Sequence, residues 1–299
     1  MLTKYKIEPK EFFSKIARGE EVGCEIPYSC NFCGCCTEIC PKKLRLQDVF
    51  KEMRRELILH NNGKSPMKGH SAIEVHQALS FSKIFNTKVG DKEAGFVKRV
   101  FVPGCSLPSY SPELVEKTFG YLQNKLPGTG AVLKCCGKPT LSLGQEEKFK
   151  ERYAEFEEAI KSLGADEVIT ACQNCYKIIS QYSPDLKVKS LWTVIPEIGL
   201  DEEMKAKGKD SDLTFAIHDA CPTRLDSDIH DGVRNIISQL GYKVKESHRS
   251  RENTKCCGFG GMVFPANPEL GKAVMVEAAE NADSLHVISY CASCREAMA

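Results

Sequence analysis

A group of five cysteines occurs twice in this chain, in the same order and at nearly the same spacing. In each copy a lone cysteine is followed by Cys-Cys-Gly and then by Cys-x-x-Cys. The lone cysteine precedes the pair by 29 residues in one copy and 34 in the other, and 35 or 33 residues separate the pair from Cys-x-x-Cys. This agreement indicates an internal duplication. The first set is Cys105, Cys135, Cys136, Cys172 and Cys175, and the second set is Cys221, Cys256, Cys257, Cys291 and Cys294.

Sixteen cysteines in 299 residues would suggest a disulfide framework only in a small secreted protein. This chain is large, and its first residues, MLTKYKIEPKEFFSKI, carry charges where a secretion signal needs an apolar core. Most of its cysteines also stand in pairs that are too close for bridges between distant loops. We therefore expect the thiols to bind metal, as zinc sites or iron–sulfur clusters.

A further group of cysteines precedes the duplication, in the run Cys30-x2-Cys33-x2-Cys36-x3-Cys40-Pro41. This spacing is typical of bacterial ferredoxins and predicts a cubane [4Fe–4S] cluster, with zinc as the competing interpretation. In two-cluster ferredoxins the fourth cysteine ligates the other cluster, yet residues 41–104 contain no cysteine. Cys40, Cys24 and Cys35 are therefore all candidates for the fourth ligand, and the spacing favours Cys40.

The chain divides into four predicted parts: a ferredoxin-like cluster module at 1–59, a linker and connecting helix at 60–96, and two cysteine-rich repeats at 97–205 and 206–299. Phe12, Phe13 and Ile16 share one helical face, which we expect to pack on the body. Residues 42–60 predict a helix, and a helical patch covers Ile73–Phe85. The histidines of this region, His60, His70 and His76, are expected to be surface or capping residues.

From Val97 onward, short apolar runs alternate with helical patterns. We predict strands at Val97–Val102, Glu167–Thr170, Leu213–Ile217 and Leu285–Ser289, helices at Pro112–Leu126, from Lys177 onward and at Asp231–Leu240, and a terminal turn after Cys291. The alternation predicts an α/β fold of two pseudo-symmetric repeats of parallel βαβ type, preceded by a small, mostly helical ferredoxin-like module. Each lone cysteine and each Cys-x-x-Cys follows a strand, so the thiols should gather at the carboxyl ends of the sheets.

The duplicated blocks resemble the cysteine-rich domain of the catalytic subunits of heterodisulfide reductases, the B-type and D-type chains. The matching segments are VPGCS at Val102–Ser106, KCCGKP at Lys134–Pro139, ACQNC at Ala171–Cys175, HDACPTR at His218–Arg224, KCCGFGG at Lys255–Gly261 and YCASC at Tyr290–Cys294. The resemblance covers roughly residues 97–299. With the ferredoxin run in front, the chain is similar to a D-type chain, or to a fused C-plus-B arrangement, that lacks one cubane motif. Iron–sulfur subunits of lactate, glycolate and glycerol-phosphate oxidation share these domains.

The resemblance implies that each five-cysteine set holds a non-cubane [4Fe–4S] cluster, which also makes these ten cysteines the candidate catalytic residues. One such cluster with a zinc ion or an empty site in the other set is the alternative. Cleavage of a disulfide takes two electrons, whereas a cubane cluster delivers one at a time. Two facing clusters can each receive one sulfur of a disulfide, and the cubane can relay electrons from a donor.

Other side chains near the cysteines are secondary candidates. Lys134, Lys138, Lys255 and Arg224 flank the motifs, either to hold an anionic thiol substrate and raise cluster potential or as ordinary surface charges. His218 and Asp219 precede Cys221, either to protonate a leaving thiolate or as a hydrogen-bonded structural pair. We assign no role to Trp192, the single tryptophan.

The composition limits the classes of function. The formal net charge is +1 and no long Lys/Arg run is present, which argues against nucleic-acid binding. No uncharged apolar stretch approaches the ~20 residues needed to span a bilayer, so we expect a cytoplasmic protein that associates with membranes only through a partner. The absence of a flavin or dinucleotide fingerprint predicts an electron-donating flavin or iron–sulfur partner subunit.

Three functions remain open from the sequence: a thiol–disulfide oxidoreductase subunit, an electron-transfer subunit linking a flavin dehydrogenase to a quinone or other carrier, and a zinc-stabilised assembly protein. The ferredoxin run argues against the third. Two complete cysteine sets favour the first, with a small disulfide, a polysulfide-like species or a quinone as the substrate.

Overall fold

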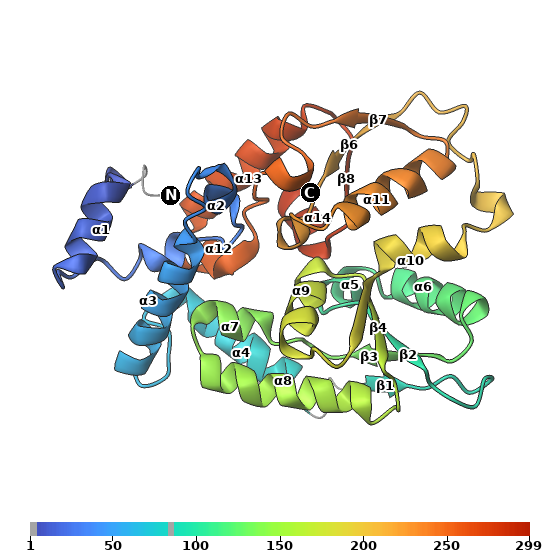
Figure 1. Ribbon diagram of the computed structural model, residues 1–299, viewed down its shortest axis with the longest axis horizontal. Helices are drawn as coiled ribbons and strands as arrows, with labels where there is room; N and C mark the ends of the chain where they lie inside the picture. The colour runs from blue at the N-terminus through green and yellow to red at the C-terminus, as the bar shows by residue number, and fades with distance from the viewer. Residues whose placement is uncertain (1–4, 83–86) are drawn as a thin grey trace.

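A five-stranded sheet forms the centre of the first cysteine-rich repeat (Figure 1). The computed structural model describes residues 5–82 and 87–299. The strand order is β1-β3-β2-β4-β5, and the strands are parallel except β1, which runs antiparallel to β3. The strands are β1 (Thr87–Val89), β2 (Arg99–Val102), β3 (Thr129–Leu133), β4 (Glu167–Thr170) and β5 (Lys187–Ser190).

The central strand β2 is buried on both faces, as expected for a parallel strand covered by helices. Val100 and Val102 pack against α8 (Glu146–Lys161) and α9 (Gln173–Tyr182). Phe101, which points to the opposite face, packs against α6 (Pro112–Lys125) and α10 (Leu191–Ile198). The first repeat is therefore a three-layer α/β/α unit.

The second repeat contains a smaller parallel sheet of three strands in the order β7-β6-β8. These are β6 (Thr214–His218), β7 (Lys243–Glu246) and β8 (Val287–Ser289), and the accompanying helices are α11 (Ser227–Gln239), α13 (Pro268–Ala282) and α14 (Ala292–Met298). Ile217 of β6 packs with Val233 and Ile237 of α11 in the core of this repeat. The two sheets are not the same size, so the duplication of the cysteines is closer than that of the strands.

The two repeats pack together through α10 and α11. A Cβ on Gly232 of α11 would lie 2.2 Å from the backbone oxygen of Trp192 of α10, so only glycine permits this approach. The Trp192 indole donates a hydrogen bond to the Ala171 carbonyl, and its ring contacts Tyr290 of the second repeat. The single tryptophan thus belongs to the interface between the repeats.

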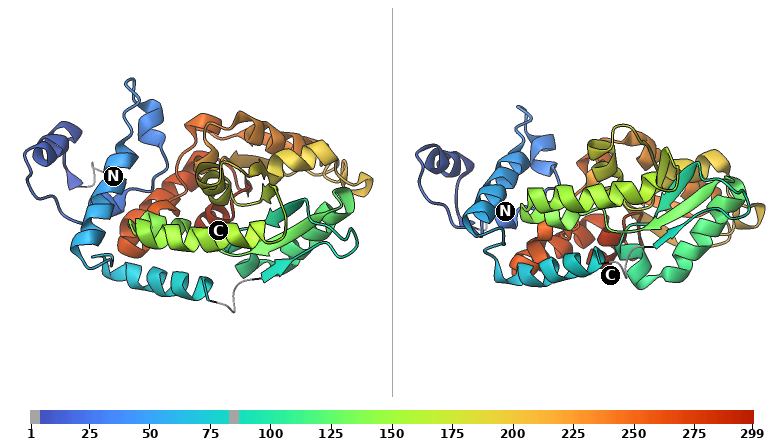
Figure 2. Two further views of the ribbon diagram at one scale, coloured as in Figure 1. Left: turned by 60° about the horizontal axis from the view of Figure 1, so that its bottom comes forward. Right: turned by 90° about the horizontal axis from the view of Figure 1, so that it is seen from below.

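The described residues before β1 form helices only: α1 (Pro9–Ala17), α2 (Cys35–Ile39), α3 (Leu46–His60) and α4 (Ser71–Ser80), with 3₁₀ turns at Pro27–Ser29 and Lys68–His70. Figure 2 shows these helices along one end and one side of the two repeats. Phe12 is fully buried against Phe13 and Phe50, which confirms that this helical face is a packing face. The short helices α5 (Ser106–Tyr110), α7 (Lys138–Leu143) and α12 (Val263–Ala266) follow cysteine motifs further along the chain.

The predicted strands agree with β2, β4, β6 and β8 to within two residues at each end, and the helix at Pro112–Leu126 agrees with α6. The predicted turn after Cys291 is wrong, because Ala292–Met298 forms α14. The predicted patch at Ile73–Phe85 corresponds to α4, but its last residues lie outside the described part of the chain. The predicted linker contributes β1 to the first sheet, which the sequence pattern did not indicate.

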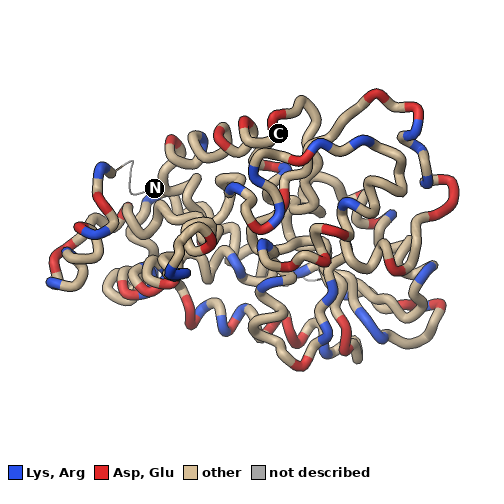
Figure 3. Tube along the Cα trace, turned by 45° about the horizontal axis from the view of Figure 1, so that its top comes forward, with Lys and Arg blue, Asp and Glu red and all other residues tan. Residues whose placement is uncertain are grey.

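Two surface properties accord with the composition. Figure 3 shows positive and negative residues interspersed along the trace. Within residues 5–82 and 87–299, no helix is both long enough and apolar enough to cross a membrane.

Candidate metal centres

The strands deliver the cysteines of both repeats in the same way. β2 ends three residues before Cys105, and β6 ends three residues before Cys221. β4 and β8 each end two residues before a Cys-x-x-Cys motif. All four motifs therefore follow the carboxyl ends of parallel strands, which confirms the predicted placement.

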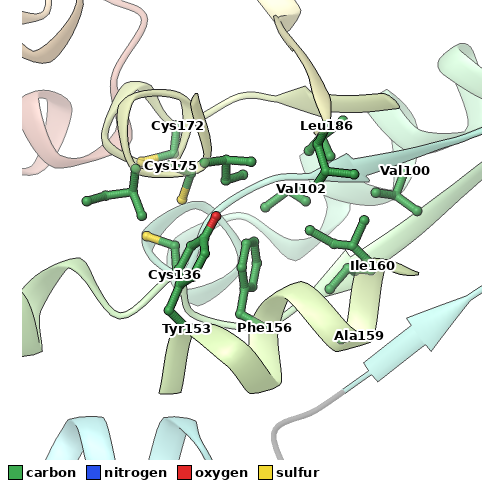
Figure 4. Close-up of a cluster of buried hydrophobic side chains, with 14 of the residues drawn as sticks. Val100, Val102, Cys136, Tyr153, Phe156, Ala159, Ile160, Cys172, Cys175 and Leu186 are labelled. Atoms are coloured by element: carbon green, nitrogen blue, oxygen red, sulfur yellow. The ribbon is translucent and has the colours of Figure 1, made fainter. Parts of the chain in front are cut away.

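The thiols of the first set lie against one another. Cys105 hydrogen-bonds to Cys135, and Cys175 hydrogen-bonds to both Cys136 and Cys172. Figure 4 shows Cys136, Cys172 and Cys175 gathered at the edge of the core beside Tyr153. Cys105 is exposed while the other four cysteines are buried, so the first set is open to solvent on one side.

A glycine permits this convergence in the first repeat. Gly104 has a φ of +87°, in the left-handed region that favours glycine, and a Cβ there would lie 2.8 Å from the Cβ of Cys172. The loop after β2 can therefore approach the loop after β4 closely enough for the thiols of both to meet.

The second set is equally close-packed and includes a histidine. Its thiols form a chain of hydrogen bonds that runs through Cys221, Cys256, Cys257, Cys294 and Cys291 in that order. His218, Cys257 and Cys294 are buried, and the potential ligand atoms of these three residues lie within 4.8 Å of one another. His218 also hydrogen-bonds to Cys257.

The two sets meet each other and also meet the N-terminal cysteine loop. Cys172 of the first set hydrogen-bonds to Cys291 of the second set. On its other side the second set contacts the N-terminal loop, where Cys33 hydrogen-bonds to Cys256. The structure thus places the second set between the first set and the N-terminal loop.

The acidity of these thiols shows what they can hold. The hydrogen bond from Cys105 lowers the pKa of Cys135 to about 7. Hydrogen bonds to Cys136 and Cys172, together with burial, raise the pKa of Cys175 well above its usual value. Buried thiols this close repel one another as thiolates, so they cannot all ionise without a compensating cation. Metal binding deprotonates thiols and supplies that cation, so both sets fit a metal centre rich in sulfur ligands.

The N-terminal loop brings together only part of its predicted ligand group. Burial raises the pKa of Cys30 to about 11, with smaller increases from Cys33 and Cys36, so these three thiols are neighbours. The Cys40 thiol interacts instead with the backbone N–H groups of Leu44, Lys42 and Lys43, which lower its pKa. The sulfur of Cys35 accepts a hydrogen bond of 3.0 Å from the Arg249 guanidinium.

Arg54 fixes this loop and is a residue that the sequence did not single out. Its side chain is fully buried and donates hydrogen bonds to four backbone carbonyls, those of Pro27, Cys30, Ser142 and Gly261. Its guanidinium also lies over the rings of Tyr28 and Phe32. One cation therefore joins the N-terminal loop to both repeats, and only long-range packing reveals it.

Arg224, a predicted anion-binding candidate, fixes the same loop from the second repeat. It donates two hydrogen bonds to the Cys33 carbonyl, of 3.2 and 3.1 Å, and others to the carbonyls of Glu252 and Thr254. Its donors are directed to the backbone, so its observed role is structural.

The three candidate lysines differ in their partners. Lys134 pairs with Glu155 at 2.9 Å, and Lys255 pairs with Glu277 at 2.5 Å. Lys138 has no hydrogen bond or ion pair among the residues that the structure describes, and it feels the charges of Cys136 in one set and Cys221 in the other. Lys138 is thus the one of the three with its charge available.

His218 and Asp219 do not pair with each other. The Asp219 carboxylate accepts two hydrogen bonds from the Arg234 guanidinium, at 3.0 and 2.9 Å, and one from the Arg251 backbone N–H. His218 is directed instead to the thiols of the second set. Among the other histidines considered, His70 is buried and bonded to Ser65 and to the Met262 carbonyl, so its role is structural.

Gln77 is another residue that the sequence analysis missed. It is fully buried, and its side-chain amide nitrogen lies 3.6 Å from the Cys135 sulfur. Its amide oxygen accepts a hydrogen bond from Thr140. A polar residue on the otherwise amphipathic α4 was the only local signal.

Comparisons with known proteins agree with this arrangement. The family described as "Cysteine-rich domain" (CCG) matches residues 100–180 and 215–299. The chain is 24% identical to the B-type chain of fumarate reductase (CoM/CoB) from Methanothermobacter marburgensis, over 98% of this chain and 60% of that protein. It is 26% identical to the D-type chain of dihydromethanophenazine:CoB–CoM heterodisulfide reductase from Methanosarcina acetivorans, over 83% of this chain and 65% of that protein.

A more distant similarity links the chain to a protein of different printed function. The chain is 22% identical to the EtfAB:quinone oxidoreductase of Syntrophomonas wolfei, over 80% of this chain and 37% of that protein. The chain spans about 60% of the length of the first curated relatives that it matches.

Proposed function

Because the chain belongs to the CCG cysteine-rich domain family, which it matches twice, we propose that it is an iron–sulfur oxidoreductase subunit that reduces a disulfide. The reaction takes up two electrons and two protons, breaks one S–S bond and releases two thiols. The electrons would come from a flavin or iron–sulfur partner subunit in the cytoplasm. The substrate would be a small disulfide.

The cysteines divide into three metal-binding groups under this proposal. The first and second sets would each hold a non-cubane [4Fe–4S] cluster, and Cys30, Cys33 and Cys36 with Cys40 would hold a cubane cluster. Residues 1–59 would then be the cluster module, 60–96 the connecting segment, and 97–205 and 206–299 the catalytic repeats. When bound, these clusters would supply and accept electrons one at a time.

The observation that carries the proposal is the unbroken contact between the three groups. Cys33 contacts Cys256 of the second set, and Cys291 of that set contacts Cys172 of the first. A protein that used its CCG domains only for structural zinc would not need its two sets to touch. Contact between them suits a reaction in which two electrons must reach two sulfur atoms of one bond.

The side chains around the two sets supply further functions. The Lys138 ammonium has no carboxylate partner among the described residues and feels the charges of both sets, so it can hold an anionic group of the substrate. Exposed Cys105 leaves the first set accessible from solvent. Arg54 and Arg224 hold the N-terminal loop in place through its backbone carbonyls.

A second function is electron transfer without disulfide chemistry, from a flavin dehydrogenase partner to a quinone or another carrier. The similarity to an EtfAB:quinone oxidoreductase favours it. The two functions require the same metal groups but differ in the final acceptor.

Metal analysis and a reductase assay test the proposal. We expect about twelve irons per chain after anaerobic purification, with matching acid-labile sulfide and no zinc. With a reduced viologen as the electron donor, disulfides should be reduced, and thiol added to oxidised protein should produce a new paramagnetic signal. Quinone reduction without disulfide reduction would support the second function. About four irons with two zincs would refute both cluster assignments in the repeats.

A further inference from the structure

One residue differs between the two repeats at a matched position beside the cysteines. Val102 is the last residue of β2 and pairs in register with Thr170 of β4. His218 is the last residue of β6 and pairs in register with Ser289 of β8. Each precedes its lone cysteine by three residues, and each pairing partner precedes its Cys-x-x-Cys by two. The second repeat therefore has an imidazole where the first has an aliphatic side chain.

The two side chains have different surroundings. Val102 is fully buried in the apolar core of the first repeat, among Val100 and Val132. His218 is only 3% exposed, and its ring lies with the thiols of Cys257 and Cys294 in a group whose potential ligand atoms are all within 4.8 Å. No other group of three or more His, Cys, Asp or Glu residues in the described part of the chain converges in this way.

The neighbouring residues leave the His218 ring available to that group. Asp219, the adjacent carboxylate, is occupied by Arg234 and by the Arg251 backbone N–H. Within residues 5–82 and 87–299, the Cys257 thiol is the only hydrogen-bond partner of the His218 side chain. A neutral imidazole among thiolates is a common metal ligand, for zinc and for iron alike.

We propose that His218 supplies a nitrogen ligand to the iron–sulfur cluster of the second set, so that the duplicated body holds two chemically unequal centres. This inference rests on the function proposed above. Thiolates carry negative charge and a neutral imidazole does not, and replacement of cysteine by histidine raises the potential of iron–sulfur centres. The second centre should therefore accept an electron more readily than the first. It is also the centre in contact with Cys33 of the N-terminal loop.

Hyperfine spectroscopy of protein that carries ¹⁵N only in its histidines tests the proposal. The full chain would be purified anaerobically, assayed for iron and zinc, reduced stepwise and examined by pulsed EPR. We expect a ¹⁵N coupling typical of direct ligation on one of the cluster signals. The coupling should disappear in His218→Val, which installs the residue of the first repeat, and the midpoint potential of that signal should fall.

Two further variants keep the test decisive. His218→Gln retains a polar side chain of similar size and replaces His218→Val if the latter does not fold. His230→Gln is the control, because His230 is a buried histidine of the same repeat whose interactions run to Asp219 and to the Thr223 backbone. It should leave the coupling unchanged.

The outcomes separate this inference from the proposed function. About twelve irons without a histidine coupling in the wild-type protein would overturn the inference and leave the proposed function standing. A coupling that persists in the His218 variants would also overturn it. A second set without iron would overturn both.

Discussion

Replacement of Arg54 by methionine should destabilise the protein by about 3 kcal/mol. The change leaves the carbonyls of Pro27, Cys30, Ser142 and Gly261 without the donors that they now share. At ~1.5 kcal/mol for each hydrogen bond to a charged donor, the four bonds contribute about 6 kcal/mol. Burial opposes this, because it lowers the pKa of Arg54 from 12.5 to about 10, which corresponds to a cost of about 3 kcal/mol.

Thermal denaturation of the metal-free protein measures the effect without interference from cluster loss. A loss of about 3 kcal/mol should lower Tm by roughly 6–12 °C in a protein of this size. Arg55→Met is the matched control, because the neighbouring Arg55 forms exposed ion pairs with Glu52 and Glu56. Such pairs contribute between zero and about 1 kcal/mol, so the control should lower Tm by no more than ~3 °C. Equal Tm values for the two variants would refute the role assigned to Arg54.

Two further predictions concern charged side chains of the repeats. Lys138→Phe, which installs the residue found at Phe259 in the second repeat, should raise the KM for an anionic disulfide about tenfold and leave the KM for a neutral disulfide unchanged, a loss of ~1.4 kcal/mol in binding; equal effects on both substrates would contradict the role of its charge. Asp219→Asn should cost about 3 kcal/mol at pH 7 in urea denaturation, because it removes one partner of the buried pair with Arg234. Although burial favours the protonated acid, Arg234 and the Arg251 N–H hold the pKa of Asp219 below 3.8, so its stabilisation is present above that pH and is lost as the pH falls further. The two proteins should converge in stability below about pH 3, and a constant difference at all pH values would contradict the argument.

The sequence predicted those parts of the site that depend on local pattern. Apolar runs of four to six residues located β2, β4, β6 and β8, and the cysteines at their carboxyl ends followed from parallel topology. The duplication predicted two metal-binding sets, and the comparisons confirm two copies of the domain.

The missing parts depend on contacts between segments that are distant in the sequence. No local pattern pairs Cys172 with Cys291 or Cys33 with Cys256, because tertiary packing alone decides which motifs meet. Arg54 has the sequence pattern of a surface residue on a charged helix, and only the surrounding carbonyls explain its burial. β1 is a three-residue edge strand that carries a lysine, which is too short for a periodic signal.

The attachment of the N-terminal loop has a consequence for the order of events during biosynthesis. Arg54 reaches the Gly261 carbonyl across 207 residues of sequence, and Arg224 reaches the Cys33 carbonyl across 191. Gly261 must also be glycine because a Cβ there would lie 2.2 Å from the Cys30 carbonyl oxygen. The cysteines that leave the ribosome first therefore obtain their final surroundings only after nearly the whole chain has been synthesised. Maturation of the N-terminal cysteine loop would then be a post-translational step that follows folding of the second repeat.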